Sequence, residues 1–355
     1  MSELRINNIT DTAGSSGPII AGVSTVTSTS HMVMPSGPTE MRGGRGRGVF
    51  GTGYNNAPNS SLNSMQFVTI ATRGNTEDFG DLADSSIGKA SFGSATRGFF
   101  AGGDSVPGQA DNKAIEFTIL SSLGGGNDFG DMSSTKAYLN GMSNDVRGFM
   151  VGGATTPEYV IQNTIEFVTM ASTGDANDFG DLSTITRSGS SAASNTRGIL
   201  QLGQTNPLPG NNLIEFITLS TLGNSQNFGE VSTLSKTGAA AGASSTRVCF
   251  MAGTGTTGNA SHVSNVIDFV TISTLGNAQD FGDTTVAVSA LAGASNSTRG
   301  LHAGGRTGTP ASEALQNVIG FITIASTGNS QDFGDLVTPT RYLAGCSDSH
   351  GGLGD

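Results

Sequence analysis

The feature that most constrains the fold of this chain is a repeat of about 50 residues, marked by the tetrapeptide Asp-Phe-Gly-Asp. A catalytic motif is needed once in each active site, so several copies of one motif indicate repeated architecture. The partners of a protein-kinase Asp-Phe-Gly motif, a Val-Ala-Ile-Lys strand and a His-Arg-Asp loop, are absent from the sequence. The tetrapeptide stands at 78–81, 128–131, 178–181, 280–283 and 332–335, and as Asn-Phe-Gly-Glu at 227–230.

Two other residues recur with the same period, which steps by 49 to 53 residues. One is an arginine, usually followed by Gly and an apolar run, and the other is the aromatic residue of phrases such as Ile-Glu-Phe-Val-Thr. Together with the tetrapeptide they define six repeats. The arginines are Arg47, Arg97, Arg147, Arg197, Arg247 and Arg299; the aromatic residues are Phe67, Phe117, Phe167, Phe216, Phe269 and Phe321; the tetrapeptide phenylalanines are Phe79, Phe129, Phe179, Phe228, Phe281 and Phe333.

Each repeat is predicted to form four short strands, as the third repeat illustrates at 136–143, 146–153, 163–172 and 178–183. No segment carries the apolar stripe of an amphipathic helix. In 165–170 both faces of the expected strand are apolar, which is typical of a strand covered on both sides. Short polar loops indicate antiparallel meanders, and radial repetition gives each meander two neighbours. We therefore predict an all-β fold, a β-propeller with four-stranded blades.

The two ends of the chain suggest seven blades rather than six. The tail, 338–355, repeats the first two strands of a unit and stops, whereas the head at 16–37 matches the outer half of a unit. A last blade shared between these segments closes the ring with strands from both termini and removes free sheet edges. The predicted domains are an N-terminal arm at 1–15 and a single propeller at 16–355, with six blades as the fallback.

Composition and charge narrow the classes of partner. The net charge is −11, and a field of that sign repels phosphate backbones, so nucleic acid is not an expected partner. No stretch is apolar enough for membrane insertion, and the N-terminus lacks the pattern of a signal peptide. Two cysteines do not make a disulfide framework. The sequence thus predicts a protein that is made and folded in a cytoplasm.

The repeated residues are predicted to be structural. Gly80 and its equivalents are expected at positive φ in a tight corner, and Phe79 and its equivalents between neighbouring blades. The acids that end the tetrapeptides suggest a ring of ion pairs with the periodic arginines or, alternatively, a ring of calcium sites. The first alternative is preferred, because two acids three residues apart offer too few oxygen ligands for calcium. These acids are Asp81, Asp131, Asp181, Glu230, Asp283 and Asp335.

No catalytic residue, metal or cofactor is predicted. The four histidines fall in different repeats, and none has metal-ligand spacing to another His or to a Cys. The Gly-x-Ser-x-Gly motif of a nucleophile elbow is absent from the sequence. Cys249 and Cys346 lie in different expected strands and are interpreted as small buried apolar residues.

The loops between the second and third strands vary in length and sequence from repeat to repeat. In a four-stranded blade they emerge on one face, together with the connectors between blades. A rigid ring with variable loops on one face suits the binding of a glycan or a protein, although such loops are also explained by a lack of constraint. The candidate binding residues in these loops are Tyr54, Asn55, Asn56, Asp104, Tyr159, Asn206, Asn211, His262 and Arg306.

The order of the strands resembles the kelch repeat, with an Arg-led strand, an apolar strand ending in Gly-Gly (Gly102-Gly103, Gly152-Gly153 and Gly304-Gly305) and two outer strands. The expected propeller is therefore kelch-like in architecture, although Phe replaces the kelch Tyr and Trp. A closer resemblance covers nearly the whole chain. The phrases at 163–182 and 296–305, behind the head at 16–50, are similar to repeat proteins of marine tailed bacteriophages, especially those of cyanobacteria.

That resemblance implies a virion structural or tail-fibre-like protein. We expect a non-enzymatic particle component, associated with the tail or its fibres, whose loops bind the host surface or a neighbouring subunit. The expected partners are other virion proteins and a host-surface glycan or protein, and the expected location is the virion. The sequence leaves two alternatives open: a capsid decoration protein, and a carbohydrate-active enzyme, which would place paired carboxylates at the mouth of the channel.

Overall fold

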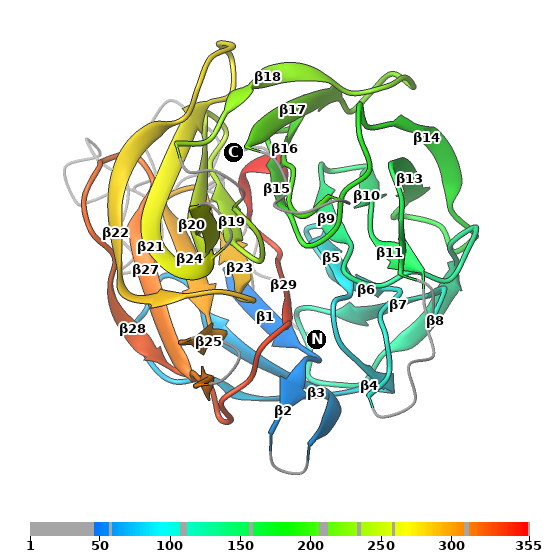
Figure 1. The fold of residues 1–355 in the computed structure, drawn as a ribbon. Coiled ribbons are helices and arrows are strands. Elements are labelled where there is room, and N and C mark those ends of the chain that lie inside the picture. The colour runs from blue at the N-terminus through cyan, green and yellow to red at the C-terminus, as the bar shows by residue number, and fades with distance from the viewer. Residues whose placement is uncertain are drawn as a thin grey trace, which may run out of the picture. The chain divides into compact units, whose positions relative to one another are not determined.

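The computed structural model describes residues 46–56, 59–106, 112–155, 159–205, 212–232, 236–257, 260–308 and 312–353. The predicted arm at 1–15 and the head at 16–37 lie outside the described residues. The unit Gly46–Asp355 is all-β, with one short 3-10 helix, η2 (Gly351–Leu353), in its described part. Its antiparallel sheets form a six-bladed β-propeller (Figure 1).

Each blade is a meander of four strands, ordered from the innermost strand at the centre of the ring to the outermost. Blade 1 contains β29 (Ala344–Ser347), β1 (Arg47–Gly51), β3 (Ser60–Thr69) and β4 (Glu77–Ser86). Blade 2 contains β5 (Ala90–Gly93), β6 (Arg97–Ala101), β7 (Ala114–Ile119) and β8 (Asn127–Asp131). Blade 3 contains β9 (Asn140–Ser143), β10 (Arg147–Val151), β13 (Thr164–Thr169) and β14 (Asn177–Asp181).

The second half of the ring follows the same pattern. Blade 4 contains β15 (Ser190–Ala193), β16 (Arg197–Gln201), β17 (Leu213–Thr218) and β18 (Gln226–Glu230). Blade 5 contains β19 (Ala240–Ala243), β20 (Arg247–Thr257), β21 (Ala260–Thr271) and β22 (Gln279–Val288). Blade 6 contains β23 (Ala292–Ser295), β24 (Arg299–Ala303), β27 (Val318–Thr323) and β28 (Gln331–Asp335). Short strands stand at loop bases: β2 (Tyr54–Asn55), β11 (Ala154–Thr155), β12 (Val160–Ile161), β25 (Arg306–Thr307) and β26 (Ala314–Leu315).

The predicted number of seven blades is wrong, and the fallback of six is correct. The tail strand β29 starts no blade of its own, because it pairs antiparallel with β1, with Gly48 opposite Ser347 and Gly51 opposite Ala344. The tail thereby supplies the innermost strand of blade 1. The prediction failed because it joined the tail to the head instead of to the strand that begins at Arg47.

The innermost strands contact one another in a closed cycle, β29, β5, β9, β15, β19, β23 and back to β29 (Figure 1). Small residues permit this close approach. A Cβ on Gly141 would lie 2.3 Å from the carbonyl oxygen of Ser91, and one on Gly293 would lie 2.2 Å from that of Ala241. The Ala-, Gly- and Ser-rich inner strands are therefore required by the narrow centre of the ring.

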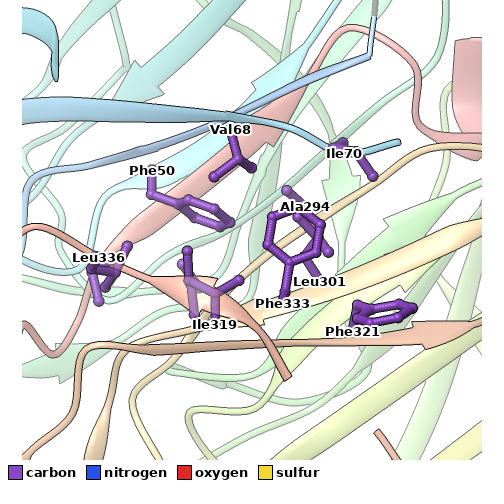
Figure 2. Close-up of a cluster of buried hydrophobic side chains, with 12 residues drawn as sticks. Phe50, Val68, Ile70, Ala294, Leu301, Ile319, Phe321, Phe333 and Leu336 are labelled. Atoms are coloured by element: carbon purple, nitrogen blue, oxygen red, sulfur yellow. The ribbon is translucent and has the colours of Figure 1, made fainter. Parts of the chain in front are cut away.

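The apolar core lies in layers between neighbouring blades. Where the last blade meets the first, Phe333 and Ile319 of blade 6 pack with Phe50, Val68 and Ile70 of blade 1 (Figure 2). Phe333 is buried, as are its equivalents in the other blades. Each tetrapeptide phenylalanine also stands edge-on to the aromatic residue of its own third strand, with ring centroids 5.8–6.1 Å apart.

Main-chain hydrogen bonds repeat the same contact at every blade boundary. The amide of Gly74 in blade 1 donates to the carbonyl oxygen of Phe333 in blade 6 at 2.9 Å. The hydrogen bond that joins each of the other pairs of neighbouring blades thus also joins blade 6 to blade 1 and closes the ring. The equivalent donors and acceptors are Gly124 to Phe79, Gly174 to Phe129, Gly223 to Phe179, Gly276 to Phe228 and Gly328 to Phe281.

In the described part of the chain the periodic arginines form no ion pair with the tetrapeptide acids, contrary to the preferred interpretation of the sequence. Each guanidinium lies over the phenylalanine ring of its own blade, 4.5–4.9 Å from the centroid. A terminal nitrogen then donates to a main-chain carbonyl of the next blade, as Arg97 does to Met170 at 3.1 Å. Among the described ion pairs of the tetrapeptide acids is a surface pair of Asp131 with Lys113. Ring stacking and carbonyl oxygens thus take the place of the expected carboxylates.

The glycine of each tetrapeptide has the positive φ that was predicted, between 137° and 157°. A second reason for glycine emerges at the blade boundary. A Cβ on Gly334 would lie 2.2 Å from the carbonyl oxygen of Gly74 in the next blade. The following amide is also bound across the boundary, since Asp335 N–H donates to Asn75 Oδ1 at 3.0 Å.

Candidate functional site: the loop face

The variable loops and the connectors between blades lie at the same end of every blade, which we call the loop face. An antiparallel bridge joins a connector to the base of a loop in each of the six blades. The geometry thus places the candidate loops beside the start of the innermost strands. The bridges are Tyr54–Arg341, Ile87–Asp104, Ala137–Ala154, Arg187–Gln204, Thr237–Thr254 and Ser289–Arg306.

A ring of residues with positive φ stands at the loop face directly before the residues that line the central cavity. Main-chain bonds link these residues from blade to blade; for example, Tyr342 N–H donates to Ala290 O at 2.8 Å and Gly88 N–H to Tyr342 O at 3.2 Å. Two members are glycine, for which this conformation costs little, whereas a bulky residue is destabilised by about 1–2 kcal/mol. The members are Gly88, Tyr138, Ser188, Gly238, Ala290 and Tyr342, with φ between 52° and 64°.

Tyrosine and arginine side chains form a continuous strip across this face. Arg341 lies 4.6 Å from the ring centroid of Tyr54 and 5.2 Å from that of Tyr342. The ring of Tyr342 meets that of Tyr138 edge-on, with centroids 5.6 Å apart. Arg187 then lies 5.7 Å from the Tyr138 centroid and 5.4 Å from the Tyr159 centroid. We call these residues the Tyr–Arg strip: Tyr54, Arg341, Tyr342, Tyr138, Arg187 and Tyr159.

Polar contacts fix the arginines of the strip and a third arginine beside it. Glu313 Oε2 accepts hydrogen bonds from Arg341 and Arg306, each at 2.8 Å. Arg187 Nε donates to Gln204 Oε1 at 3.0 Å, and no acid among the described residues forms an ion pair with Arg187. Two guanidinium groups therefore share the partly exposed Glu313 carboxylate, whereas the third, that of Arg187, is held by an uncharged amide.

The central tyrosine of the strip is held in its neutral form. Burial raises the pKa of Tyr138, and the neighbouring Tyr342, Tyr159 and Asp104 add to that rise, while Arg187 opposes it. A neutral phenol keeps its O–H as a hydrogen-bond donor at all physiological pH values. The strip thus offers aromatic faces, phenol hydroxyls and cationic groups.

The opposite mouth of the channel is closed by the C-terminal residues. Asp348 Oδ1 accepts the amide of Gly46 at 2.7 Å, and His350 Nε2 lies 2.9 Å from the carbonyl oxygen of Gly93. The helix η2 then contacts β9, β15 and β19, across the ring from β29. Between the two mouths lies a cavity of about 130 Å³, lined mainly by Ala, Gly and Ser. That volume is below the range of a typical ligand pocket, so the candidate site is the face above it.

Buried ion pairs between lysine and an acid of the third strand have a structural role. Lys236 Nζ donates to Asp268 Oδ2 at 2.9 Å and also to the carbonyl oxygens of Phe250 and Val266. Burial lowers the pKa of Lys236, and the Asp268 charge opposes that shift. In blade 3, burial raises the pKa of Glu166, but the Lys136 charge and hydrogen bonds outweigh it and the net shift is downward. These groups satisfy one another inside the blades.

The predicted loop candidates divide into three groups. Tyr54, Tyr159 and Arg306 belong to the strip or its polar contacts. Asn55 and Asp104 are buried, whereas Asn56 and His262 are exposed and contact no strip residue in the described interactions. Asn206 and Asn211 lie outside the described residues.

Sequence reasoning missed four of the six strip residues because it searched only the loops. Tyr138, Arg187, Arg341 and Tyr342 stand in the connectors, three or fewer residues before an innermost strand. A signal was present: the chain has only four tyrosines, and all of them belong to the strip. Glu313, the shared carboxylate, carried no such signal in the sequence.

Other reactive groups in the described part of the chain are buried or isolated. No group of three or more His, Cys, Asp or Glu side chains there could hold a metal ion. Burial raises the pKa of Cys249 and of Cys346 to about 12, and it lowers the pKa of His302 to about 4. The described residues also contain no helix that is long and apolar enough to cross a membrane.

Fold and site together define a six-bladed β-propeller with an aromatic and cationic strip on its loop face. No protein-family model matches the chain, and no curated protein shows significant sequence similarity to it.

Proposed function

We propose that the protein is a non-enzymatic structural component of a tailed-bacteriophage particle, located on the tail or its fibres, that attaches to the host surface through its loop face. The observation that carries the proposal is the Tyr–Arg strip, which gathers every tyrosine of the chain on the face where the blades differ. The assignment to a particle rests on the similarity of the repeat phrases to those of marine phage proteins.

The geometry of the described loop face favours binding over catalysis. Glycoside hydrolysis uses two carboxyl groups about 5–10 Å apart, one to donate a proton and one to attack or activate water. Glu313 is instead held by two arginines, and Asp104 is only 1% exposed. Neither carboxylate is placed for proton transfer to a ligand on the strip.

The location of the protein on purified particles tests the proposal, by cryo-EM or by a gold-labelled antibody. We expect label on the tail or its fibres. Label over the capsid would make the protein a decoration protein instead, and particles without label would remove the particle assignment.

An adsorption assay tests the role of the loop face. Host cells incubated first with the purified protein are expected to adsorb phage more slowly. The double variant R187Q/R341Q is expected to lose that competition, whereas R73Q, which removes one arginine from a hairpin at the far end of blade 1, keeps it. Equal competition by all three proteins would exclude the strip as the attachment surface.

A further inference from the structure

We infer that the Tyr–Arg strip is a binding site for an acidic polysaccharide, one that carries carboxylate or sulfate groups. This inference rests on the proposed function of the loop face and names the class of ligand. The strip interleaves aromatic rings and guanidinium groups from Tyr54 at one end to Tyr159 at the other. A sugar ring has an apolar C–H face for an aromatic ring and polar edges for hydrogen-bonding groups.

The cationic charge of the strip favours acidic polysaccharides over neutral ones. The described strip and its contacts carry Arg187, Arg306 and Arg341 against Glu313, with Asp104 buried nearby. The chain as a whole has a net charge of −11. The cationic charge of the strip is therefore a local feature of an acidic molecule, and guanidinium groups bind carboxylate and sulfate oxygens through paired N–H donors.

Contacts within the protein hold the strip in place before a ligand binds. The ring–guanidinium contacts and the bonds of Arg187 to Gln204 and Arg341 to Glu313 fix long side chains before any ligand binds. Less conformational entropy is then lost on binding. An exposed arginine without such contacts gains little from binding an anion, because its side chain loses conformational entropy and solvent screens its charge.

Backbone conformation is an independent pointer to the same residues. Tyr138 and Tyr342 adopt φ of 59° and 55° at positions where two other blades have Gly88 and Gly238. The chain therefore keeps bulky aromatic residues where glycine is allowed and less strained. Strained conformations that persist in this way cluster at binding sites.

Other polyanions fit these observations less well. Nucleic acid presents a dense line of phosphates and needs a continuous basic surface along that line, whereas the strip carries two arginines separated by aromatic rings. A peptide strand would need an open sheet edge or an apolar groove, whereas the strip consists of side chains above a closed ring of strands. A flexible acidic saccharide needs only ring faces and spaced cations, which the strip provides.

The test uses the purified full chain and three immobilised polysaccharides: alginate, which is carboxylated, dextran sulfate, and neutral dextran. We expect binding to alginate, to dextran sulfate or to both, and none to neutral dextran. Binding to only one acidic polymer would identify the anionic group. Equal binding to neutral dextran, or binding to none of the three, would overturn the inference.

Matched variants separate the strip from general charge attraction. R187Q and R341Q are each expected to weaken binding about tenfold, the effect of one charge-assisted hydrogen bond. Y159A is expected to weaken it several-fold through lost stacking, and R73Q, with the same change of charge on the other face, less than twofold. An equal effect of R73Q would mean that the strip is not the site. Thermal melting of each variant checks folding, and particle location remains a separate test of the proposed function.

Discussion

The loop face and the opposite, hairpin face of the propeller differ in how far the six blades resemble one another. At the hairpin face every blade places an arginine over a phenylalanine and donates to a carbonyl of the next blade. At the loop face the equivalent connector positions carry Arg341, Ile87, Ala137, Arg187, Thr237 and Ser289. The repeated contacts hold the ring together, and the positions released from that role carry the Tyr–Arg strip.

The largest expected effect comes from removing a repeated ring between blades. Phe333→Ala should lower the free energy of unfolding by about 3–5 kcal/mol, because it opens a cavity in the layer that closes the ring. Tyr159→Ala on the loop face should cost less than about 1 kcal/mol, since surface substitutions rarely cost more. Denaturant unfolding of both variants measures the difference. Similar losses in the free energy of unfolding would show that the loop face stabilises the fold as much as the contacts between blades do.

Lowering the pH should destabilise the fold through His302 but have little effect on the binding of polysaccharide to the strip. Burial lowers the pKa of His302 in blade 6 to about 4, so the folded protein favours neutral imidazole. A depressed histidine pKa contributes its full stability above the unfolded pKa, and this contribution is lost as the pH falls from about 6.5 towards 4. The loss amounts to roughly 3 kcal/mol for a fully buried group.

The variant His302→Gln should remove that part of the pH dependence. Unfolding curves at several pH values measure it, and an unchanged slope in the variant would contradict the assignment. Guanidinium binding of carboxylate and sulfate groups does not depend on the protonation of His302. The amount of polysaccharide retained by still-folded protein should therefore change little between about pH 5 and 7.

A smaller effect is expected from replacing one arginine on each face by alanine. Arg299→Ala should destabilise the fold by about 2 kcal/mol, because it loses ring stacking on Phe321 and the bond to Ile70 O. Arg187→Ala should destabilise it by less than about 1 kcal/mol while weakening the binding of acidic polysaccharide. If both variants lost stability equally, Arg187 would belong to the scaffold.

The smallest effect concerns the positive-φ ring. Ser188→Gly should raise the free energy of unfolding by up to about 1 kcal/mol, because glycine relieves the left-handed conformation at φ 52°. The matched change Gly238→Ser at the equivalent position of the next blade should lower it by a similar amount. A chemical denaturation series on the two variants tests both signs.

Much of the fold could be predicted from the sequence because its determinants are local and repeated. The period, the four-stranded blades and the positive φ of Gly80 and its equivalents follow from turn chemistry and strand patterning. The number of blades could not be predicted from these local patterns. It depends on which strand pairs with β29, and that choice is a contact between residues about 300 positions apart.

The candidate site shows the same division. Tyr54, Tyr159 and Arg306 were found in the sequence because they stand in variable loops, but nothing along the chain joins Tyr54 to Arg341 or Tyr138 to Tyr342. Likewise the periodic arginines and acids suggested ion pairs, whereas the nearest partners in the ring are aromatic faces and carbonyl oxygens.

The sequence by itself determined that this chain is a repeat of four-stranded β units with variable loops, because strand periodicity and glycine corners act over a few residues. Only the tertiary structure decided that six units close the ring and that four tyrosines and two arginines meet on one face. The physical reason is that ring closure and the strip both consist of contacts between blades. Such contacts depend on distances in space that a one-dimensional period does not encode.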